Sequence, residues 1–202
     1  MADLKISQLT GATTPLAGTE VVPLVQSGST RKVSVNGLTT GKFVPANGMI
    51  FPATQVASAD PNTLDDYEEG TWTPQLTFAT AGDLAVTYGR NAGWYQKIGN
   101  TVYVSFTIFA SAFTFTTASG ALRITGLPFT VSNSTDNYVS VGCAFEGFTK
   151  VGYGWVTVET VPGAAYLTCS AYGSGVGVAG LTTTEVTSGS RKIIQAQLQY
   201  RV

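Results

Sequence analysis

A chain of 202 residues with a formal net charge of −1 has no overall field that would draw it to nucleic acid or to an anionic membrane. Only 11% of the residues are charged, so Thr, Ser, Asn, Gln and Gly must cover most of the surface, and we expect part of the apolar surface to lie in contacts between subunits. The chain contains no histidine, which removes the commonest general base and the commonest metal ligand.

No apolar run approaches the roughly 20 residues that a membrane helix needs. The first residues, from Met1 to Lys5, lack the apolar core of a signal peptide. We therefore expect a protein that is made in a cytoplasm, is not secreted by a signal-peptide route and does not insert into a membrane.

Residues 1–41 are predicted to form a short β-rich module. Residues 21–25 and 31–35 flank a polar stretch over residues 26–30 that suits a hairpin turn. A two-stranded hairpin is only marginally stable alone in water, so this module needs a partner surface. The residues expected to make that attachment are Leu4, Ile6, Leu9, Val21, Val22 and Leu24.

Residues 42–69 show no sustained period and are predicted to form an extended connector wrapped against neighbouring chains. Pro45, Pro52 and Pro61 interrupt any regular strand or helix. The connector ends in five of the twelve acidic residues of the chain, namely Asp60, Asp65, Asp66, Glu68 and Glu69. We expect a solvated acidic collar here. A cation held between chains and a glycosidase carboxylate pair are the alternatives, although the spacing lacks the glycine turn of a calcium loop.

Residues 70–202 are predicted to be all-β, because apolar and polar residues alternate with a period of two between glycine-rich breaks. One such alternation joins Trp72, Leu76 and Phe78. The clearest runs to the end of the chain, with Ile194, Ala196, Leu198, Tyr200 and Val202 on one face and Gln195, Gln197, Gln199 and Arg201 on the other. About eight short antiparallel strands predict a jelly-roll-like β-sandwich head whose C-terminus is paired in a sheet.

The two cysteines, Cys143 and Cys169, lie in alternating apolar strands. We expect two buried, reduced thiols, with a disulfide between neighbouring strands as the alternative in an oxidising setting.

Candidate chemistry is sparse in the head. The glycine-rich stretches 152–155 and 171–177 lack the Lys-Ser/Thr ending of a phosphate loop and are predicted to be turns. No serine with a base partner, no metal-ligand spacing and no basic stripe is present. We therefore predict that the protein is not an enzyme, has no cofactor or metal site and does not bind nucleic acid.

Aromatic residues beside glycine breaks are the best candidates for contacts with a receptor. Tyr153, Trp155 and Tyr172 lie where loops would expose their rings, and an exposed ring can stack on the apolar face of a sugar. The competing interpretation places these rings in the core or in a subunit interface, because aromatic side chains bury large areas. Trp72 and Trp94 are expected to be structural.

Two pairs of segments resemble proteins of tailed bacteriophages. Residues 2–10 (ADLKISQLT) and 19–26 (TEVVPLVQ) are similar to an N-terminal virion-attachment module. Residues 64–74 (LDDYEEGTWTP) and 93–102 (GWYQKIGNTV) resemble the entry to the β-rich distal head of tail-fibre and other virion appendage proteins.

This resemblance implies a structural protein of a phage virion. A tail-fibre-like protein would attach to tail or baseplate proteins through its N-terminus, and its head would bind a host-surface glycan or protein. The resemblance also implies a homotrimer, intertwined through the connector. The alternative is a decoration or cement protein that binds the major capsid protein, since such proteins share most of these sequence features.

Overall fold

The computed structural model describes residues 21–26, 28–34, 51, 54, 58–60, 62–189 and 191–202, with only the backbone described for the paired strands within residues 21–34. The chain divides into two units, Met1–Ile50 and Phe51–Val202. Leu4, Ile6, Leu9 and most of the predicted connector lie outside the described residues.

The first unit contains the predicted hairpin. Strand β1 (Val21–Gln26) pairs antiparallel with β2 (Ser29–Ser34), and Gln26 lies opposite Ser29. Gly28 has a φ of 76°, a left-handed conformation that suits the tight turn of a hairpin and that glycine adopts without steric cost. The hairpin is confirmed, with a shorter turn than predicted. Val21, Val22 and Leu24 lie on β1, and their role in attachment stays a prediction.

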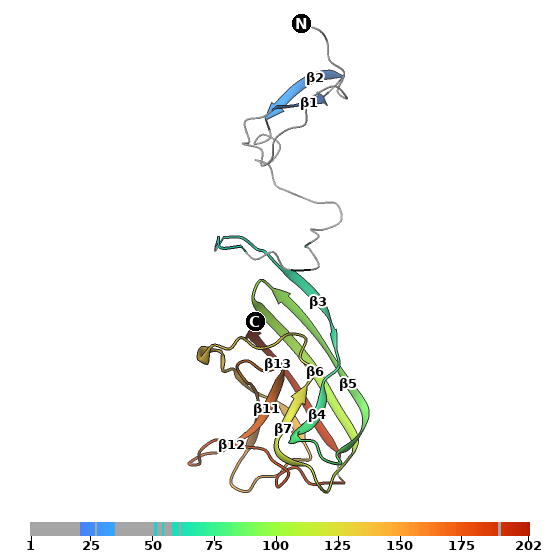
Figure 1. Cartoon of the computed structure of the whole chain (residues 1–202), viewed down its shortest axis with the longest axis vertical. Coiled ribbons are helices and arrows are strands. Elements are labelled where there is room, and N and C mark those ends of the chain that lie inside the picture. The colour runs from blue at the N-terminus through green and yellow to red at the C-terminus, as the bar shows by residue number, and fades with distance from the viewer. Residues whose placement is uncertain are drawn as a thin grey trace. The chain divides into compact units, whose positions relative to one another are not determined.

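Within the described residues, the second unit is built from two antiparallel sheets (Figure 1). The five-stranded sheet has the order β3 (Tyr67–Trp72), β5 (Ala85–Ile98), β6 (Thr101–Thr114), β13 (Lys192–Arg201) and β9 (Ala144–Glu146). The six-stranded sheet has the order β4 (Gln75–Thr80), β7 (Ser119–Thr125), β11 (Tyr166–Tyr172), β10 (Trp155–Thr160) and β8 (Ser140–Gly142), and β12 (Ala179–Gly180) also pairs with β11. The part of the chain that is described contains one short 3₁₀ helix (Thr135–Asn137) and no α-helix.

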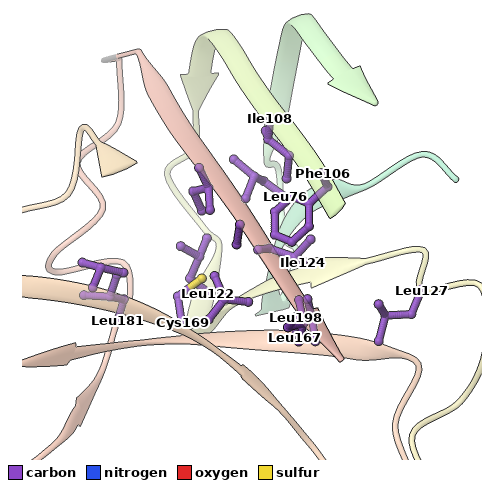
Figure 2. Packing of buried hydrophobic residues seen from close by; sticks show 14 of the residues in the cluster. Leu76, Phe106, Ile108, Leu122, Ile124, Leu127, Leu167, Cys169, Leu181 and Leu198 are labelled. Carbon is purple, nitrogen blue, oxygen red and sulfur yellow. The ribbon is translucent and has the colours of Figure 1, made fainter. Parts of the chain in front are cut away.

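Both sheets contribute to one apolar core. Figure 2 shows Phe106, Ile108 and Leu198 of the five-stranded sheet in the same interior as Leu122, Ile124, Leu167 and Cys169 of the six-stranded sheet. Trp72 and Phe106 meet edge to face with 5.4 Å between ring centroids. The all-β, antiparallel prediction is therefore confirmed, and the two sheets enclose their core as in a β-sandwich.

The C-terminal strand forms as predicted. Strand β13 buries Ile194, Ala196, Leu198 and Tyr200 and exposes the three glutamines between them. It pairs with β6 along its whole length and with β9 on its other edge. The end of the chain is therefore held inside the five-stranded sheet.

The alternation through Trp72, Leu76 and Phe78 spans two strands and not one. Strand β3 ends at Trp72 and β4 begins at Gln75 in the other sheet, with Thr73 and Pro74 between them. Proline cannot donate a ladder hydrogen bond, so the strand stops there. The period of two persists because residues of the same parity face the common core from either sheet.

The longest strands depart from the prediction of short strands. Strands β5 and β6 are 14 residues each and form one hairpin. Gly89 and Gly93 lie within β5 and do not end it: Gly89 lies at a bulge, and Gly93 lies where the backbone closely approaches Trp72. The register shifts between Thr87 and Arg90, around Gly89, and a Cβ atom at Gly93 would lie 2.3 Å from Nε1 of Trp72.

The predicted acidic collar is not uniformly solvated. Asp66 is buried and pairs with the buried ammonium group of Lys97, which also lies 5.3 Å from the ring centroid of Phe129. Tyr67 already belongs to β3 and donates to Glu69 at 2.8 Å. The described part of the chain holds no group of three or more His, Cys, Asp and Glu side chains suited to a metal ion.

Candidate functional site

The β10–β11 hairpin presents a polar and aromatic surface on the outside of the six-stranded sheet. Val156 and Val158 of β10 are buried in the core, so the alternate residues of that strand point outward. Trp155 lies opposite Tyr172, and Thr157 lies opposite Ser170. Directly opposed residues share a face and stand side by side. We call this surface the hydroxyl face, and it consists of Ser140, Trp155, Thr157, Glu159, Ser170 and Tyr172.

The carboxylate of Glu159 is the centre of the hydroxyl face. Its Oε1 accepts from the hydroxyls of Tyr172 at 2.7 Å, Thr157 at 3.1 Å and Ser140 at 3.2 Å. Its Oε2 accepts from the hydroxyl of Ser170 at 2.8 Å. Hydrogen bonds to a carboxylate are charge-assisted and stronger than those between neutral groups. Glu159 is therefore fixed in place by residues of three strands, β8, β10 and β11.

Two of these hydroxyls lie beneath the surface and two reach it. Thr157 and Ser170 are buried, with 7% and 5% exposure. Ser140 is exposed, and Glu159 and Tyr172 are half-buried. Glu159 forms none of the salt bridges found among the described residues. The surface thus presents the carboxylate of Glu159, which accepts hydrogen bonds from four hydroxyls and, within the described part of the chain, has no cation in contact with it.

An aromatic platform adjoins this carboxylate. Trp155 is 53% exposed and borders Tyr172 across the strand pair. The sequence-based prediction placed both residues beside exposed loops. Trp155 instead begins β10 and Tyr172 ends β11, and the register of these two strands brings them together. Their role as receptor contacts stays a prediction.

The third predicted residue, Tyr153, lies at a small pocket beside the hydroxyl face. This pocket has a volume of about 130 Å³, and Trp155 borders it as well as the hydroxyl face. The ammonium group of Lys150 lies 5.5 Å from the ring centroid of Tyr153 and 2.6 Å from Oε1 of Glu185. Burial would raise the pKa of Glu185, but the hydrogen bonds from Lys150 and Thr182 outweigh it and hold the pKa below its ordinary value.

The other charged residue on the outside of this sheet is Arg123 of β7, which is not part of the hydroxyl face. Its guanidinium stacks on Tyr166 at 4.3 Å. Arg123 and Glu159 lie opposite Thr168 on either side of β11, so their backbones are about 10 Å apart at the usual strand spacing. Sequence reasoning missed Glu159 and Arg123. The sequence feature that could have indicated each of them is a charged residue at an outward position of a strand that alternates between apolar and polar residues.

The outside of the five-stranded sheet carries a different set of side chains. Trp94 is 51% exposed and Tyr103 is 42% exposed, whereas Trp72 is buried as expected. We call this surface the glutamine face, and it consists of Trp94, Gln96, Tyr103, Ser105, Gln195, Gln197 and Gln199. A shallow hollow of about 440 Å³ lies over it, bordered by Trp94, Tyr103 and Val139.

Both cysteines are free thiols, and no disulfide joins them. Cys169 is buried in the core as predicted, and Cys143 is half-buried. Burial raises the pKa of the Cys143 thiol to about 11 and that of Cys169 well above its ordinary value.

No protein-family model matches this chain, and neither does any curated protein. Among solved structures, the crystal structure of the Dettilon tailspike protein (gp208) is similar, with a TM-score of 0.52 and 16% sequence identity. The match covers 67% of this chain and 24% of the tailspike chain, so the present chain matches about a quarter of that protein. At this identity the likeness shows a shared fold. Across the described residues, no helix is both long and apolar enough to cross a membrane.

Proposed function

We propose that this protein is a non-enzymatic structural component of a tailed-phage virion, which attaches to the tail through residues 1–41 and binds a host-surface saccharide with its β-sandwich head. The observation that carries the saccharide part is the exposed Trp155 beside Tyr172, next to the hydroxyl-bonded Glu159. The virion part is supported by the resemblance of the N-terminal and junction motifs to phage appendage proteins. The fold that the head shares with a phage tailspike agrees with it.

The proposed mechanism is multivalent adhesion. A flat aromatic platform holds a single sugar only weakly, because it encloses little of the ligand. Several copies of the head on one particle turn later contacts into intramolecular events and raise the overall strength without any new contact. Such a protein needs a rigid head and more than one copy.

We further propose that the copies associate through the glutamine face, as a homotrimer. Trp94 and Tyr103 supply exposed apolar area there. Most of the neighbouring outward side chains are amides and hydroxyls, and Glu69, which lies opposite Gln96, adds an exposed charge. A glutamine amide both donates and accepts, so a glutamine on one copy can pair with a glutamine on another. This arrangement is consistent with the 11% charged residues of the chain.

The position of the protein on intact particles tests the virion assignment. We expect gold-labelled antibody against the head to decorate the tail or baseplate in electron micrographs. Label spread over the capsid would instead identify a decoration protein bound to the major capsid protein, and particles without label would overturn the virion assignment. An antibody preabsorbed with the purified protein is the control.

Two further measurements test attachment and catalysis separately. A chain lacking residues 1–41 should retain the β circular-dichroism spectrum of the head and fail to assemble onto particles. Assembly of that chain would overturn the attachment role of this module. Incubation of the full chain with host polysaccharide should release no reducing ends, and their release would identify an enzyme.

A further inference from the structure

We propose that the hydroxyl face selects saccharides that present hydroxyl or ammonium donors and rejects those that present carboxylate, phosphate or sulfate groups, with Glu159 as the specificity-determining residue. This inference rests on the proposed saccharide binding and goes beyond it by naming the chemical class of the ligand.

The direction of the hydroxyl protons determines which groups this surface can bind. An ionised carboxylate can only accept hydrogen bonds, and a Ser, Thr or Tyr hydroxyl has one proton to give. Ser140, Ser170 and Tyr172 each direct that proton to Glu159. Thr157 does so as well, because its hydroxyl lies closer to Glu159 than to its other acceptor, the carbonyl oxygen of Ser170. The hydroxyls that reach the surface, those of Ser140 and Tyr172, are thereby left with lone pairs and no proton for a ligand.

The surface beside Trp155 is consequently a set of acceptors. A sugar hydroxyl or an ammonium group can donate to Tyr172 Oη, Ser140 Oγ or Glu159. A carboxylate, phosphate or sulfate carries only acceptors, so it would meet lone pairs and leave them unmatched. A buried or shielded polar group without a partner costs more free energy than a made hydrogen bond returns, and this asymmetry is what gives discrimination.

The charge of the site acts in the same direction. Glu159 has no cation in contact among the described residues, and the guanidinium of Arg123 on the outside of this sheet stacks on the ring of Tyr166. An anionic sugar stacked on Trp155 would therefore approach an uncompensated negative charge. The ammonium group of an amino sugar carries a positive charge, so Glu159 would attract it and favour binding of the amino sugar.

The position of Glu159 is also well defined. Thr157 and Ser170 lie beneath it and are buried, so they hold the carboxylate from the protein side while its neighbours Ser140 and Tyr172 meet the ligand. A polar group that is already oriented loses little entropy on binding. This is why a single carboxylate on an open surface can determine specificity.

Binding of the full chain to a printed array of bacterial surface polysaccharides tests the inference. The array contains neutral repeats, amine-bearing repeats, and repeats with uronate, phosphate or sulfate groups. We expect binding to the neutral and amine-bearing repeats only. Loss of the stacking platform in Trp155→Ala should weaken this binding at least about tenfold.

Glu159→Gln is the decisive variant, because it removes the negative charge and replaces one acceptor oxygen with an NH2 donor at nearly the same side-chain volume. Binding to neutral and amine-bearing repeats should fall about tenfold, and binding to anionic repeats should rise relative to the original protein. Tyr172→Phe, which keeps the ring and removes one surface acceptor, should weaken neutral-repeat binding a few-fold. It replaces Glu159→Gln as the deciding variant if the latter does not fold.

Matched controls change the same chemistry elsewhere. Tyr138→Ala removes an aromatic side chain that is 69% exposed, and Asp136→Asn removes one exposed negative charge. Both should leave the binding profile unchanged.

The outcomes separate the two proposals. If Trp155→Ala abolishes binding while Glu159→Gln keeps the original profile, the acceptor argument is wrong and saccharide binding stands. Preference of the original protein for anionic repeats would have the same meaning. If binding is present but indifferent to Trp155→Ala, the site lies elsewhere and the inference is overturned. If no polysaccharide on the array is bound, both the inference and the saccharide part of the proposed function fail.

Discussion

The two outer faces of the sandwich share a pleat and a core, yet they differ in how their polar groups are organised. On the hydroxyl face, one carboxylate collects the protons of four hydroxyls, so the surface is oriented and negative. On the glutamine face, amides that both donate and accept lie around Trp94 and Tyr103, and the exposed Glu69 lies opposite Gln96. In our proposals, the first arrangement selects ligands and the second binds another copy of the chain.

The difference shows how a chain with few charges can use them. Most outward positions need only be polar, which Thr, Ser, Gln and Asn satisfy. A carboxylate at such a position imposes a direction on every hydroxyl around it. The surface property that matters here is therefore the direction of hydrogen bonds, which composition does not reveal.

Removal of residues 197–202 should have the largest effect, because it destroys the support of both faces together. Strand β13 lies between β6 and β9 and buries Leu198 and Tyr200 in the common core. We expect loss of the cooperative thermal transition and of the β circular-dichroism spectrum. A truncated protein with an unchanged melting temperature would show that the two faces do not depend on this strand.

The buried pair of Asp66 and Lys97 contrasts with the surface carboxylate of Glu159. Asp66→Ala leaves an ammonium group in the interior and should lower the free energy of unfolding by about 3–5 kcal/mol. Glu159→Gln, which acts at a half-exposed position, should cost less than half of this. Chemical denaturation of both variants provides the measurement.

A double variant is the control for this contrast. Adding Lys97→Met to Asp66→Ala should recover much of the loss, because both charges of the pair are then removed from the interior. Equal costs for Asp66→Ala and Glu159→Gln would remove the distinction between interior and surface carboxylates.

Asp83 gives the smallest expected effect and tests how hydroxyls hold a fully exposed carboxylate. The hydroxyl of Thr116, followed by the backbone N–H groups of Thr116 and Thr117, lowers the pKa of Asp83 well below its ordinary value of 3.8. A lowered folded-state pKa contributes stability above the unfolded value that is lost as the pH falls through the folded value.

The original protein and Asp83→Asn should therefore differ slightly in melting temperature at pH 7 and converge as the pH falls from about 4 towards 2. A melting-temperature difference that stays constant over this range would show that the hydroxyls around Asp83 do not favour its charged form.

The sequence predicts those parts of the fold that depend on local alternation. Strand β13 follows directly from its period of two. The glycine-rich stretches 152–155 and 171–177 were predicted to be turns, and this is wrong at Trp155, which begins β10, and at residues 171–172, which end β11. The passage of the chain from β3 to β4 is hidden, because Trp72 and Leu76 keep the same parity on either side of Pro74. Local patterns report which side of a strand is buried and not which sheet the strand joins.

The candidate site was predicted only in its aromatic part. Trp155 and Tyr172 were accessible to prediction because glycine breaks flank them. The environment of Glu159 depends on partners 11 to 19 residues away on other strands, and that of Asp66 depends on a lysine 31 residues away. Likewise, Trp72 and Trp94 occupy similar motifs, and only the strand register shows that one is buried and the other exposed.

Native mass spectrometry of the full chain tests the assignment of the two faces most directly, because one spectrum counts both the copies of the chain and the bound ligands. The ligand is an oligosaccharide prepared from the neutral or amine-bearing polysaccharide that binds best. We predict a trimer with bound ligand for the original protein, a trimer without ligand for Trp155→Ala, and a monomer that still binds ligand for Trp94→Ala. The reverse result, with Trp155→Ala dissociated into ligand-binding monomers and Trp94→Ala a trimer without ligand, would contradict the account and exchange the roles of the two faces.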